Sequence, residues 1–381
     1  MAENGKRKIR LGMVGGGREA FIGYVHRIAS RIDGNYDLVA GALSSRPDNA
    51  RASGEDLGLA GDRIYTDYNE MAKAEGARED GIEAVSIVTP NHMHVGPARA
   101  FLEAGIHVIC DKPLANTLDD ARTLAKISPT NGAQFLLTHN YTGYPLVRQA
   151  RQMVADGKLG NIRVIQVEYP QDWLTEEVHN KQADWRTDPE RSGAGGCIGD
   201  IGTHAYNLAR FISGVELESL SADLHTFVAG RQLDDNVHIM LRFKGGAKGM
   251  LWASQVAPGN ENGPTIRIYG DKGGLEWMQI EPNKMWFCPF GEPRQLMTRG
   301  GATPIGADAP AGASIRVPPG HPEGYLEAFA TLYSEFAEVI RTGKPNTLLP
   351  NLADGVEGMQ FIDAAVKSSG SNSAWVNLSD F

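Results

Sequence analysis

Two places in the sequence carry side chains that can move a proton. Asp200 and His204 stand four residues apart in "GGCIGDIGTHAYNLARF" (195–211), which is about one turn of a helix, and Lys112 stands in "CDKP". Histidine can act as a general base near neutral pH, because its unperturbed pKa lies there. A carboxylate beside it can stabilise the imidazolium, and an ammonium favours negative charge that develops on oxygen. These types suit the oxidation of a secondary alcohol, with His204 as base and Asp200 and Lys112 assisting.

Each of these residues also has a simpler interpretation. Asp200 could cap a helix, with His204 as a surface residue of its first turn. Asp200, His204 and His179 could bind a metal, but they form no compact ligand set, and we predict no metal site. Lys112 could pair with Asp111, although adjacent residues of a strand point to opposite faces. The rest of the sequence has to decide between these roles and catalysis.

A glycine-rich turn near the N-terminus has the pattern of a dinucleotide-binding motif. The apolar run Ile9–Val14 is followed by Gly15, Gly16 and Gly17 and then by Ala20, in the spacing G-x-G-x-x-A. The first glycine permits a tight turn, the second lets the backbone approach a pyrophosphate, and a small third residue lets strand and helix pack. Because glycines also serve ordinary turns, the motif needs support from the elements around it.

Strands alternate with helices along the first 140 residues. After the first strand we expect strands at 36–43, near 63–65, and at 82–90, 106–113 and 134–140, and helices at 49–57, 68–77, 94–105 and 118–127. The alternation predicts an α/β fold with a doubly wound parallel sheet, whose ligands bind at the carboxyl ends of the strands. Polar residues gather at those ends. We therefore predict these NAD(P)-binding residues: Gly15, Gly17, Arg18, Ser44, Ser45, Arg46, Thr89, Pro90, Asn91, His94, Asp111, Lys112 and Asn140.

The end of the second strand bears on the choice between NAD and NADP. An acidic residue there would bind the ribose 2′-hydroxyl, but the sequence has Ser44, Ser45 and Arg46 instead. A hydroxyl and a guanidinium suit a 2′-phosphate, which slightly favours NADP. Arg46 could also point into water or stack on the adenine, and NAD permits both.

From about residue 145 the alternation stops and strands dominate. We expect a helix at 146–160, strands with period-two alternation and Gly-Gly turns, a long loop at 298–322, and a last long helix at 325–341. Such strands are typical of an antiparallel or mixed sheet with one covered face. The sequence thus predicts two domains, a dinucleotide-binding Rossmann domain at 1–144 and a substrate-binding α+β domain at 145–381.

Composition excludes several classes of protein. The chain has 381 residues, 41% of them hydrophobic, and a net charge of −9, which argues against binding of nucleic acid by charge. Its three cysteines, Cys110, Cys197 and Cys288, imply no disulfide framework, and we interpret Cys197 as a small buried residue. The sequence shows no signal-peptide pattern and no run of 18 apolar residues. We therefore expect a cytoplasmic protein that binds neither nucleic acid nor membrane.

Several motifs, in order, resemble the glucose–fructose oxidoreductase/inositol dehydrogenase (Gfo/Idh/MocA) family. They are "VGGGREA", "TPNHMH", "CDKPLA", "WRTDPE", "SGAGGCIGDIGTH", "GHPEGYLEAF" and "DGVEGMQFIDAA". The resemblance implies an NAD(P)-dependent oxidoreductase of sugars and inositols, with a Rossmann domain and a C-terminal domain. The large, mostly antiparallel open sheet of that second domain would mediate a homodimer or homotetramer.

The resemblance also assigns roles to individual residues. The lysine of the family's E-K-P motif falls on Lys112, and its D-x-x-x-H pair falls on Asp200 and His204. Asp111 replaces the usual glutamate, and Asn207 stands where many members have aspartate, so polyol contacts there can differ.

Polar and aromatic residues of the second half are placed to line a sugar pocket. The predicted substrate-binding residues are Lys112, Tyr141, Trp185, Arg186, Asp200, His204 and His321, with Tyr144 and Asn207 as further candidates. We predict transfer of hydride between nicotinamide and a secondary ring hydroxyl of a sugar, glycoside or inositol. Two alternatives stay open. One is an NAD-dependent glycosidase with transient redox chemistry, and the other is a non-catalytic sensor of nucleotide and sugar.

Overall fold

The computed structural model describes residues 7–18, 20–300 and 311–381, which form two compact units. The first unit comprises Met1–His139 and Phe329–Val356, and the second comprises Asn140–Ala328 and Glu357–Phe381. Within the described ranges, no helix is both long enough and apolar enough to cross a membrane.

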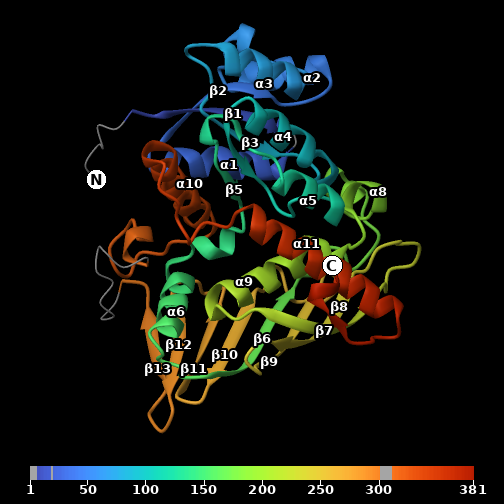
Figure 1. Ribbon diagram of the computed structural model, residues 1–381, viewed down its shortest axis with the longest axis vertical. Helices are drawn as coiled ribbons and strands as arrows, with labels where there is room; N and C mark the ends of the chain where they lie inside the picture. Colours follow the sequence, from blue (N-terminus) through green and yellow to red (C-terminus); the bar gives the residue numbers. More distant parts are fainter. Residues whose placement is uncertain (1–6, 19, 301–310) are drawn as a thin grey trace. The chain divides into compact units, whose positions relative to one another are not determined.

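The first unit contains a five-stranded parallel sheet in the order β2-β1-β3-β4-β5 (Figure 1). Its strands are β1 (Ile9–Gly15), β2 (Tyr36–Ala42), β3 (Ala84–Val88), β4 (His107–Cys110) and β5 (Phe135–Leu137). The helices between them are α1 (Phe21–Ile32), α2 (Pro47–Asp56), α3 (Tyr68–Ala77), α4 (Val95–Glu103) and α5 (Leu118–Ala125). Every residue of β3 is buried, as expected for a central parallel strand. The predicted α/β fold is confirmed.

The strand expected near 63–65 is wrong. A short 3-10 turn covers Gly61–Arg63, and only Ile64 makes an isolated bridge to Gly41 of β2. The chain cannot continue along the sheet, because Asp67 caps α3 by accepting the N–H groups of Asn69 and Glu70.

The second unit is built on a nine-stranded sheet in the order β13-β12-β11-β10-β6-β9-β8-β7-β14. Neighbouring strands run antiparallel except β6 and β9, which run parallel, so the predicted mostly antiparallel sheet is confirmed. The strands are β6 (Ile162–Pro170), β7 (Leu217–His225), β8 (Asn236–Phe243), β9 (Lys248–Ser254), β10 (Thr265–Gly270), β11 (Gly273–Met278), β12 (Lys284–Pro289), β13 (Gln295–Thr298) and β14 (Val376–Asn377).

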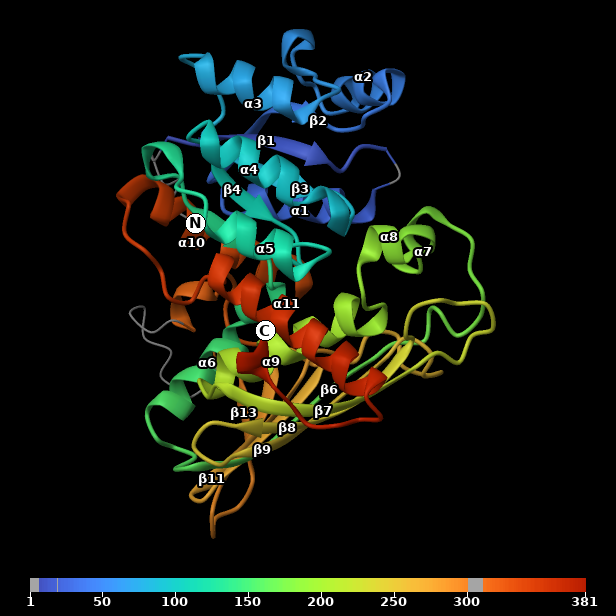
Figure 2. The same cartoon turned by 45° about the vertical axis from the view of Figure 1, so that its right-hand side comes forward.

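Helices α6 (Pro145–Ala155) and α9 (Thr203–Ser213) lie on one side of this sheet (Figure 2). Helix α9 packs on β6, β9 and β10, and α6 packs against α9 and β11. Two short helices, α7 (Lys181–Arg186) and α8 (Pro189–Ser192), precede a π-helical turn at Ile198–Gly202 that runs directly into α9.

The C-terminal part of the chain has one more long helix than the sequence predicted. Helix α10 (Tyr325–Thr342) is confirmed, but α11 (Leu352–Gly370) follows it, so α10 is not the last long helix. Small residues such as Gly355 and Gly358 dilute the apolar stripe of α11, which weakens its helical periodicity. Of the loop expected at 298–322, residues 301–310 lie outside the described residues, and Gly312–Ser314 forms a 3-10 turn.

Candidate functional site

The glycine-rich turn after β1 has the backbone that a pyrophosphate requires. Gly15 has a φ of +78°, a conformation that side-chain-bearing residues rarely adopt. A Cβ on Gly17 would lie 2.7 Å from the carbonyl oxygen of Leu43 and 2.8 Å from Oγ of Ser53. Both positions therefore need glycine, for a tight turn at Gly15 and for a close approach at Gly17.

The close contact between strand and helix lies at a residue that the sequence analysis missed. Ala20, the predicted small third residue, is the N-cap of α1 and makes no side-chain cap. Gly23, inside the first turn, packs on the backbone, because a Cβ there would lie 2.4 Å from Cα of Gly16. A further glycine three residues after Ala20 was the available signal.

These features fit a dinucleotide. The glycines at 15–17 and the N-terminus of α1, whose first N–H groups have no partner within the helix, would hold a pyrophosphate. When bound, NAD(P) supplies the site that accepts or donates hydride.

Two arginines predicted to bind the cofactor have different environments. Arg18 forms a two-pronged ion pair with Asp56, with Nε–Oδ2 and Nη2–Oδ1 distances of 2.6 and 2.9 Å. Arg46, the exposed N-cap of α2, donates its backbone N–H to Oγ of Ser44 at 3.2 Å. No described side chain pairs with the Arg46 guanidinium, and Ser45 is also exposed. Arg46 is thus available to a ligand, whereas Arg18 is held by Asp56.

The segment after β3 is tied to the turn that carries Lys112. Thr89 donates its hydroxyl to the carbonyl of Met93, and Pro90 caps the 3-10 turn that buries Asn91. The buried ring of His94 lies 2.7 Å from the carbonyl oxygen of Pro113 through Nδ1 and 2.9 Å from that of Thr89 through Nε2. Burial lowers the pKa of His94. His94 therefore lies between two loops, and its neutral ring, which has a single N–H, can donate to one of these two carbonyls at a time.

The turn of Lys112 is supported from inside the first unit. The Lys112–Pro113 peptide bond is cis. The Asp111 carboxylate accepts the Thr138 hydroxyl at 2.8 Å and lies 3.9 Å from Nε2 of the buried His26. Burial raises the pKa of Asp111, but His26, Lys112 and Thr138 together hold it below its usual range. Asp111 is thus an ionised interior partner of the turn, rather than a group directed at solvent.

The residues after β5 add a neutral histidine and a buried amide. Burial, assisted by the charge of Lys112, lowers the pKa of His139 to about 3, so His139 carries no charge near neutral pH. The side chain of Asn140 is buried, and its Nδ2 donates no hydrogen bond to the described residues. A buried donor of this kind is costly unless a ligand accepts from it, which supports the predicted binding role of Asn140.

Asp200 is oriented by side chains from two other segments of the second unit. Its Oδ2 accepts Nε of Arg186 at 3.1 Å and Nε2 of Gln255 at 2.9 Å. The N-cap of α9 is Gly202, so Asp200 does not cap this helix. The Asp200 carboxylate thus stands in a π-helical turn, a feature that occurs frequently at functional sites, and two donors fix its orientation.

His204 is buried against two tyrosine rings. Its ring centroid lies 5.0 Å from that of Tyr141 and 6.1 Å from that of Tyr169. The hydroxyls of these tyrosines lie 2.5 Å apart, and Tyr169 donates to Asn262 at 2.8 Å. Burial raises the pKa of Tyr141 to about 12. The Tyr141 hydroxyl is therefore a neutral member of an interior network, and its ring supports His204.

The predicted pocket residues Trp185 and Arg186 lie together with Asp200. The guanidinium of Arg186 stands 4.3 Å above the ring of Trp185 and 5.9 Å from that of Trp173. Trp173 and Gln255 were missed by the sequence analysis, because nothing local marks them as neighbours of a site.

Other candidates lie apart from this cluster. His321 is exposed, and its backbone carbonyl accepts Arg299 in the loop before α10. Asn207 is half-buried on α9, and His179 is exposed beside Glu177. The Cys197 thiol is buried, which raises its pKa and keeps it protonated. Among the described side chains, no group of three His, Cys, Asp or Glu residues could hold one metal ion.

Both halves of the chain match one family. Residues 9–141 match the oxidoreductase family described as having an NAD-binding Rossmann fold, and residues 147–276 match the GFO/IDH/MocA C-terminal domain. An uncharacterized oxidoreductase of Bacillus subtilis (strain 168), YfiI, is 34% identical over 99% of this chain and 100% of its own length. The chain belongs to the Gfo/Idh/MocA family. Gfo/Idh/MocA proteins similar to this chain include a levoglucosan dehydrogenase of Pseudarthrobacter phenanthrenivorans, 28% identical over 98% of both chains.

Solved structures of Gfo/Idh/MocA proteins share the whole fold. The crystal structure of an oxidoreductase from Sinorhizobium meliloti is 56% identical, with a TM-score of 0.89 over 97% of this chain and 100% of that one. An inositol dehydrogenase homolog from Azotobacter vinelandii, complexed with NADH and myo-inositol, is 36% identical, with a TM-score of 0.89 over 97% and 98%. The chain is therefore a member of an NAD-binding oxidoreductase family that includes sugar and inositol dehydrogenases.

Proposed function

We propose that the chain is an NAD(P)-dependent dehydrogenase that transfers hydride between nicotinamide and a secondary ring hydroxyl of a sugar, glycoside or inositol. One observation carries the proposal. Asp200, held by Arg186 and Gln255, stands four residues before the buried His204, in a chain whose other unit has a dinucleotide cradle. Levoglucosan, after which one relative is named, and myo-inositol, which is bound in the structure of another, support a cyclic polyol as substrate.

The residues divide the chemistry between them. In the oxidation direction, His204 takes the proton from the substrate hydroxyl as the carbon–hydrogen bond breaks. Asp200 accepts a hydrogen bond from substrate or imidazole and stabilises the imidazolium, and its ion pair with Arg186 fixes the orientation of its carboxylate. Lys112 stabilises negative charge on the reacting oxygen.

We further propose NADP as the slightly preferred cofactor. The support is the exposed Arg46 at the end of β2, which no described side chain engages, beside the hydroxyl of Ser44. A 2′-phosphate offers such a guanidinium a charged acceptor.

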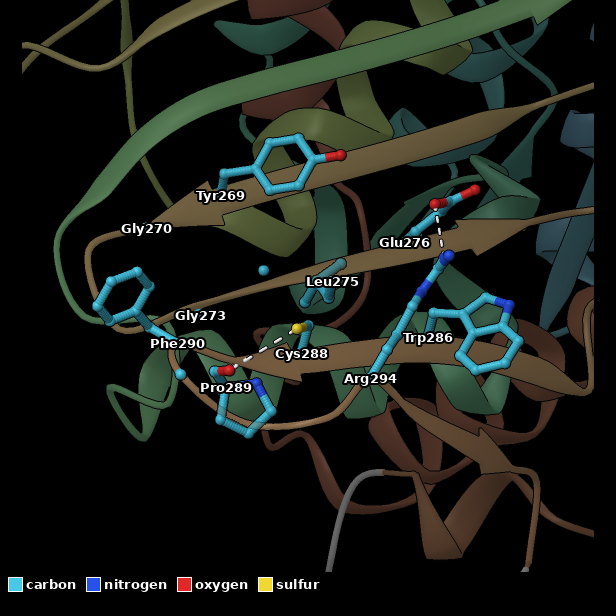
Figure 3. A pocket seen from close by; sticks show the side chains of 12 residues that line it. Tyr269, Gly270, Gly273, Leu275, Glu276, Trp286, Cys288, Pro289, Phe290 and Arg294 are labelled. Atoms are coloured by element: carbon cyan, nitrogen blue, oxygen red, sulfur yellow. Dashed lines mark hydrogen bonds and ion pairs between the residues drawn. The ribbon is translucent and has the colours of Figure 1, made fainter.

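A second copy of the chain is the partner that we propose for the sheet of the second unit. Paired residues of a sheet share a face. Val164 with Tyr269, Met240 with Met250, and Trp286 with Leu296 place exposed apolar side chains on one such face. A hollow of about 410 Å³ opens there beside Tyr269, Trp286 and the 86% exposed Phe290 (Figure 3). An exposed apolar face of this kind favours an isologous contact, in which the same face of two copies of the chain packs together. Sedimentation should show a dimer or tetramer, which Met240→Glu shifts toward monomer.

The function is tested by following the absorbance of reduced nicotinamide with purified protein, NAD and NADP in parallel, and a panel of sugars, glycosides and inositols. A rising signal with one polyol fixes reaction class, cofactor and substrate family together. Cofactor binding without turnover of any polyol would contradict the proposal. Cleavage of a glycoside without net reduction would then indicate the transient-redox glycosidase, and binding without any reaction would indicate the sensor.

A further inference from the structure

The start of the segment that carries Asp200 and His204 is held by one residue from a distant part of the chain. Gly196 donates its N–H to Oδ1 of Asp234 at 2.7 Å, and Ile198 donates its N–H to Oδ2 at 2.8 Å. Between them, Cys197 donates its N–H to the backbone carbonyl of Asp234 at 2.8 Å. Three successive backbone donors therefore converge on a single aspartate.

The contact is so close that it requires glycine at position 196. Asp234 is buried, with 8% of its surface exposed. A Cβ on Gly196 would lie 2.4 Å from the carbonyl oxygen of Asp234, so only glycine permits this approach. Gly196 thus serves the contact with Asp234, whereas a Cβ on Gly195 would meet the side chain of Ile198.

The segment held in this way leads directly into the site. Ile198, whose N–H binds Asp234, opens the π-helical turn Ile198–Gly202, and Asp200 stands within that turn. Helix α9, with His204 as its second residue, follows without a break. The first N–H groups of a helix have no partner within the helix. A carboxylate that accepts them fixes where the helix begins and how it is rotated.

The same corner of the sheet also touches the Asp200 side chain. Gln255, just after β9, donates its N–H to the carbonyl of Asp235 at 2.8 Å and its Nε2 to Asp200. The neighbouring carboxylate of Asp235 points elsewhere, to the N–H groups of Phe227 and Val228 and to Arg231. Of the two adjacent buried aspartates, only Asp234 therefore binds the segment of the site.

We propose that Asp234 is a positioning residue of the reaction, which sets the placement of Asp200 and His204 by anchoring the three N–H groups before them. This inference rests on the proposed function for its link to turnover. The anchoring itself does not depend on the proposed function, because it can be measured in the protein without substrate.

The protonation of Asp234 fits this role. Burial raises its pKa to about 6, against the backbone hydrogen bonds from Ile198 and Gly196, and the charge of Asp235 adds to the rise. Near pH 7.5 the carboxylate is ionised, and both oxygens can accept. Below about pH 6 one oxygen carries a proton, so one of the two backbone donors loses its partner.

The test compares Asp234→Asn with Asp235→Asn in the full-length protein. Both variants replace a buried carboxylate by its isosteric amide, but only Asp234→Asn places an NH2 group against a backbone donor of the segment. Hydrogen exchange of the backbone is followed at 196–204 and, as an internal reference, at 227–231. kcat, KM and cofactor affinity are measured on the polyol found above.

We expect Asp234→Asn to speed exchange at 196–204 and to lower kcat about 10- to 100-fold, since small misplacement of catalytic groups is costly. Cofactor affinity should change less than about threefold, because the cofactor cradle belongs to the first unit. Asp235→Asn should speed exchange at 227–231 and leave kcat within about threefold.

Unchanged exchange at 196–198 in Asp234→Asn, or accelerated exchange with wild-type kcat, would overturn the inference. If wild-type protein oxidises no polyol, the proposed function fails, and the exchange data alone decide whether Asp234 anchors the segment. If Asp234→Asn does not fold, Gly196→Ala probes the same contact from the other side, with the same expected exchange and kcat.

Discussion

The two units position their functional groups in different ways. In the first unit, the cofactor cradle is made by glycines that lie within nine residues of one another, Gly15 to Gly23. In the second unit, Asp200 is oriented by Arg186, 14 residues away, and by Gln255, 55 residues away. A binding surface made of backbone can be encoded locally, whereas an oriented side chain needs tertiary partners.

This difference has a functional consequence. Changes in the cradle should weaken cofactor binding and leave the chemistry intact. Changes around Asp200 should weaken turnover and leave cofactor binding intact. Lys112 departs from this division. It lies in the first unit, but its proposed role is in turnover rather than in cofactor binding.

The largest effect is expected from the proposed catalytic residues. His204→Ala removes the base, and Lys112→Ala removes the charge beside the reacting oxygen, so each should lower kcat by about 10²-fold or more. Fluorescence titration should still show cofactor binding in both. The matched control is His179→Ala, which removes an exposed histidine outside the cluster. Turnover near that of wild type in either variant would remove that residue from the mechanism.

The next effect concerns the cradle itself. In Gly17→Ala the new Cβ would stand 2.7 Å from a backbone oxygen that cannot move away easily, so cofactor affinity should fall about 10-fold or more. Gly61→Ala is the control within the same unit, because a Cβ there meets nothing within 4 Å. Titration of both variants with NAD and NADP measures the difference. Equal affinities would mean that the pyrophosphate does not approach this turn.

The sequence was sufficient wherever the signal is periodic or local. Alternating strands and helices predicted the parallel sheet, and period-two strands predicted the large antiparallel one, because burial of one face imposes these patterns directly. The three-residue stretch at 63–65 failed for the opposite reason. Ile64 forms only a single bridge, which requires no alternation of apolar and polar residues. The extended segment then ends at Asp67, whose side chain caps the next helix, α3.

The residues that we propose to move protons can be selected from the sequence, whereas the residues that support them cannot. Lys112, Asp200 and His204 are marked by residue type and spacing. Asp234 lies just before β8 and Gln255 just after β9. Only the pairing of these two strands brings both residues to the segment at 196–200. The sequence predicts that Tyr141 binds substrate, and it gives no sign that the Tyr141 hydroxyl is hydrogen-bonded to Tyr169.

A support of Asp200 can be removed without touching the proposed base. Gln255→Leu deletes one of two donors to Oδ2 of Asp200. Because Arg186 still donates to the same oxygen, kcat/KM should fall about 5- to 10-fold, which corresponds to the loss of one ordinary hydrogen bond of about 1 kcal/mol. Cofactor affinity should not change. Gln152→Leu, on α6, is the control, because that glutamine donates to Asp156 near the surface. A change in cofactor affinity instead of kcat/KM would break the division between the two units.

The buried Asp234 and the half-buried Asp111 should give the units opposite dependences of stability on pH. Asp234 has a pKa raised from 3.8 to about 6 by burial, so between these values the folded state binds more protons than the unfolded state. Its contribution to the free energy of unfolding then falls as pH rises, by about 3 kcal/mol in all. Asp111 has a lowered pKa, so its contribution is present above the unfolded pKa and is lost as pH falls below it.

Urea unfolding from about pH 2.5 to 7 measures this contrast, because the contribution of Asp111 changes mainly below its unfolded pKa of 3.8 and that of Asp234 changes between 3.8 and about 6. Asp234→Asn should gain stability relative to wild type as pH rises across that range. Asp111→Asn should lose stability relative to wild type as pH rises from the acid end. If the stability of both variants relative to wild type changed in the same direction with pH, the environments assigned to the two aspartates would be contradicted.

The smallest effect is expected at the end of β2, where the sequence argues for a phosphate and the structure leaves the arginine exposed. An exposed pair between Arg46 and a 2′-phosphate is screened by water, so Arg46→Asp should shift the ratio of kcat/KM for NADP over NAD toward NAD by only about 2- to 5-fold. The new carboxylate could accept the ribose hydroxyls of NAD, which adds to the shift. Arg51→Asp, an exposed arginine of α2, controls for the general change of charge. If both variants shift the ratio equally, the effect is long-range charge alone. If neither does, Arg46 faces water or the adenine, and the cradle at Gly15–Gly17 carries cofactor binding without help from β2.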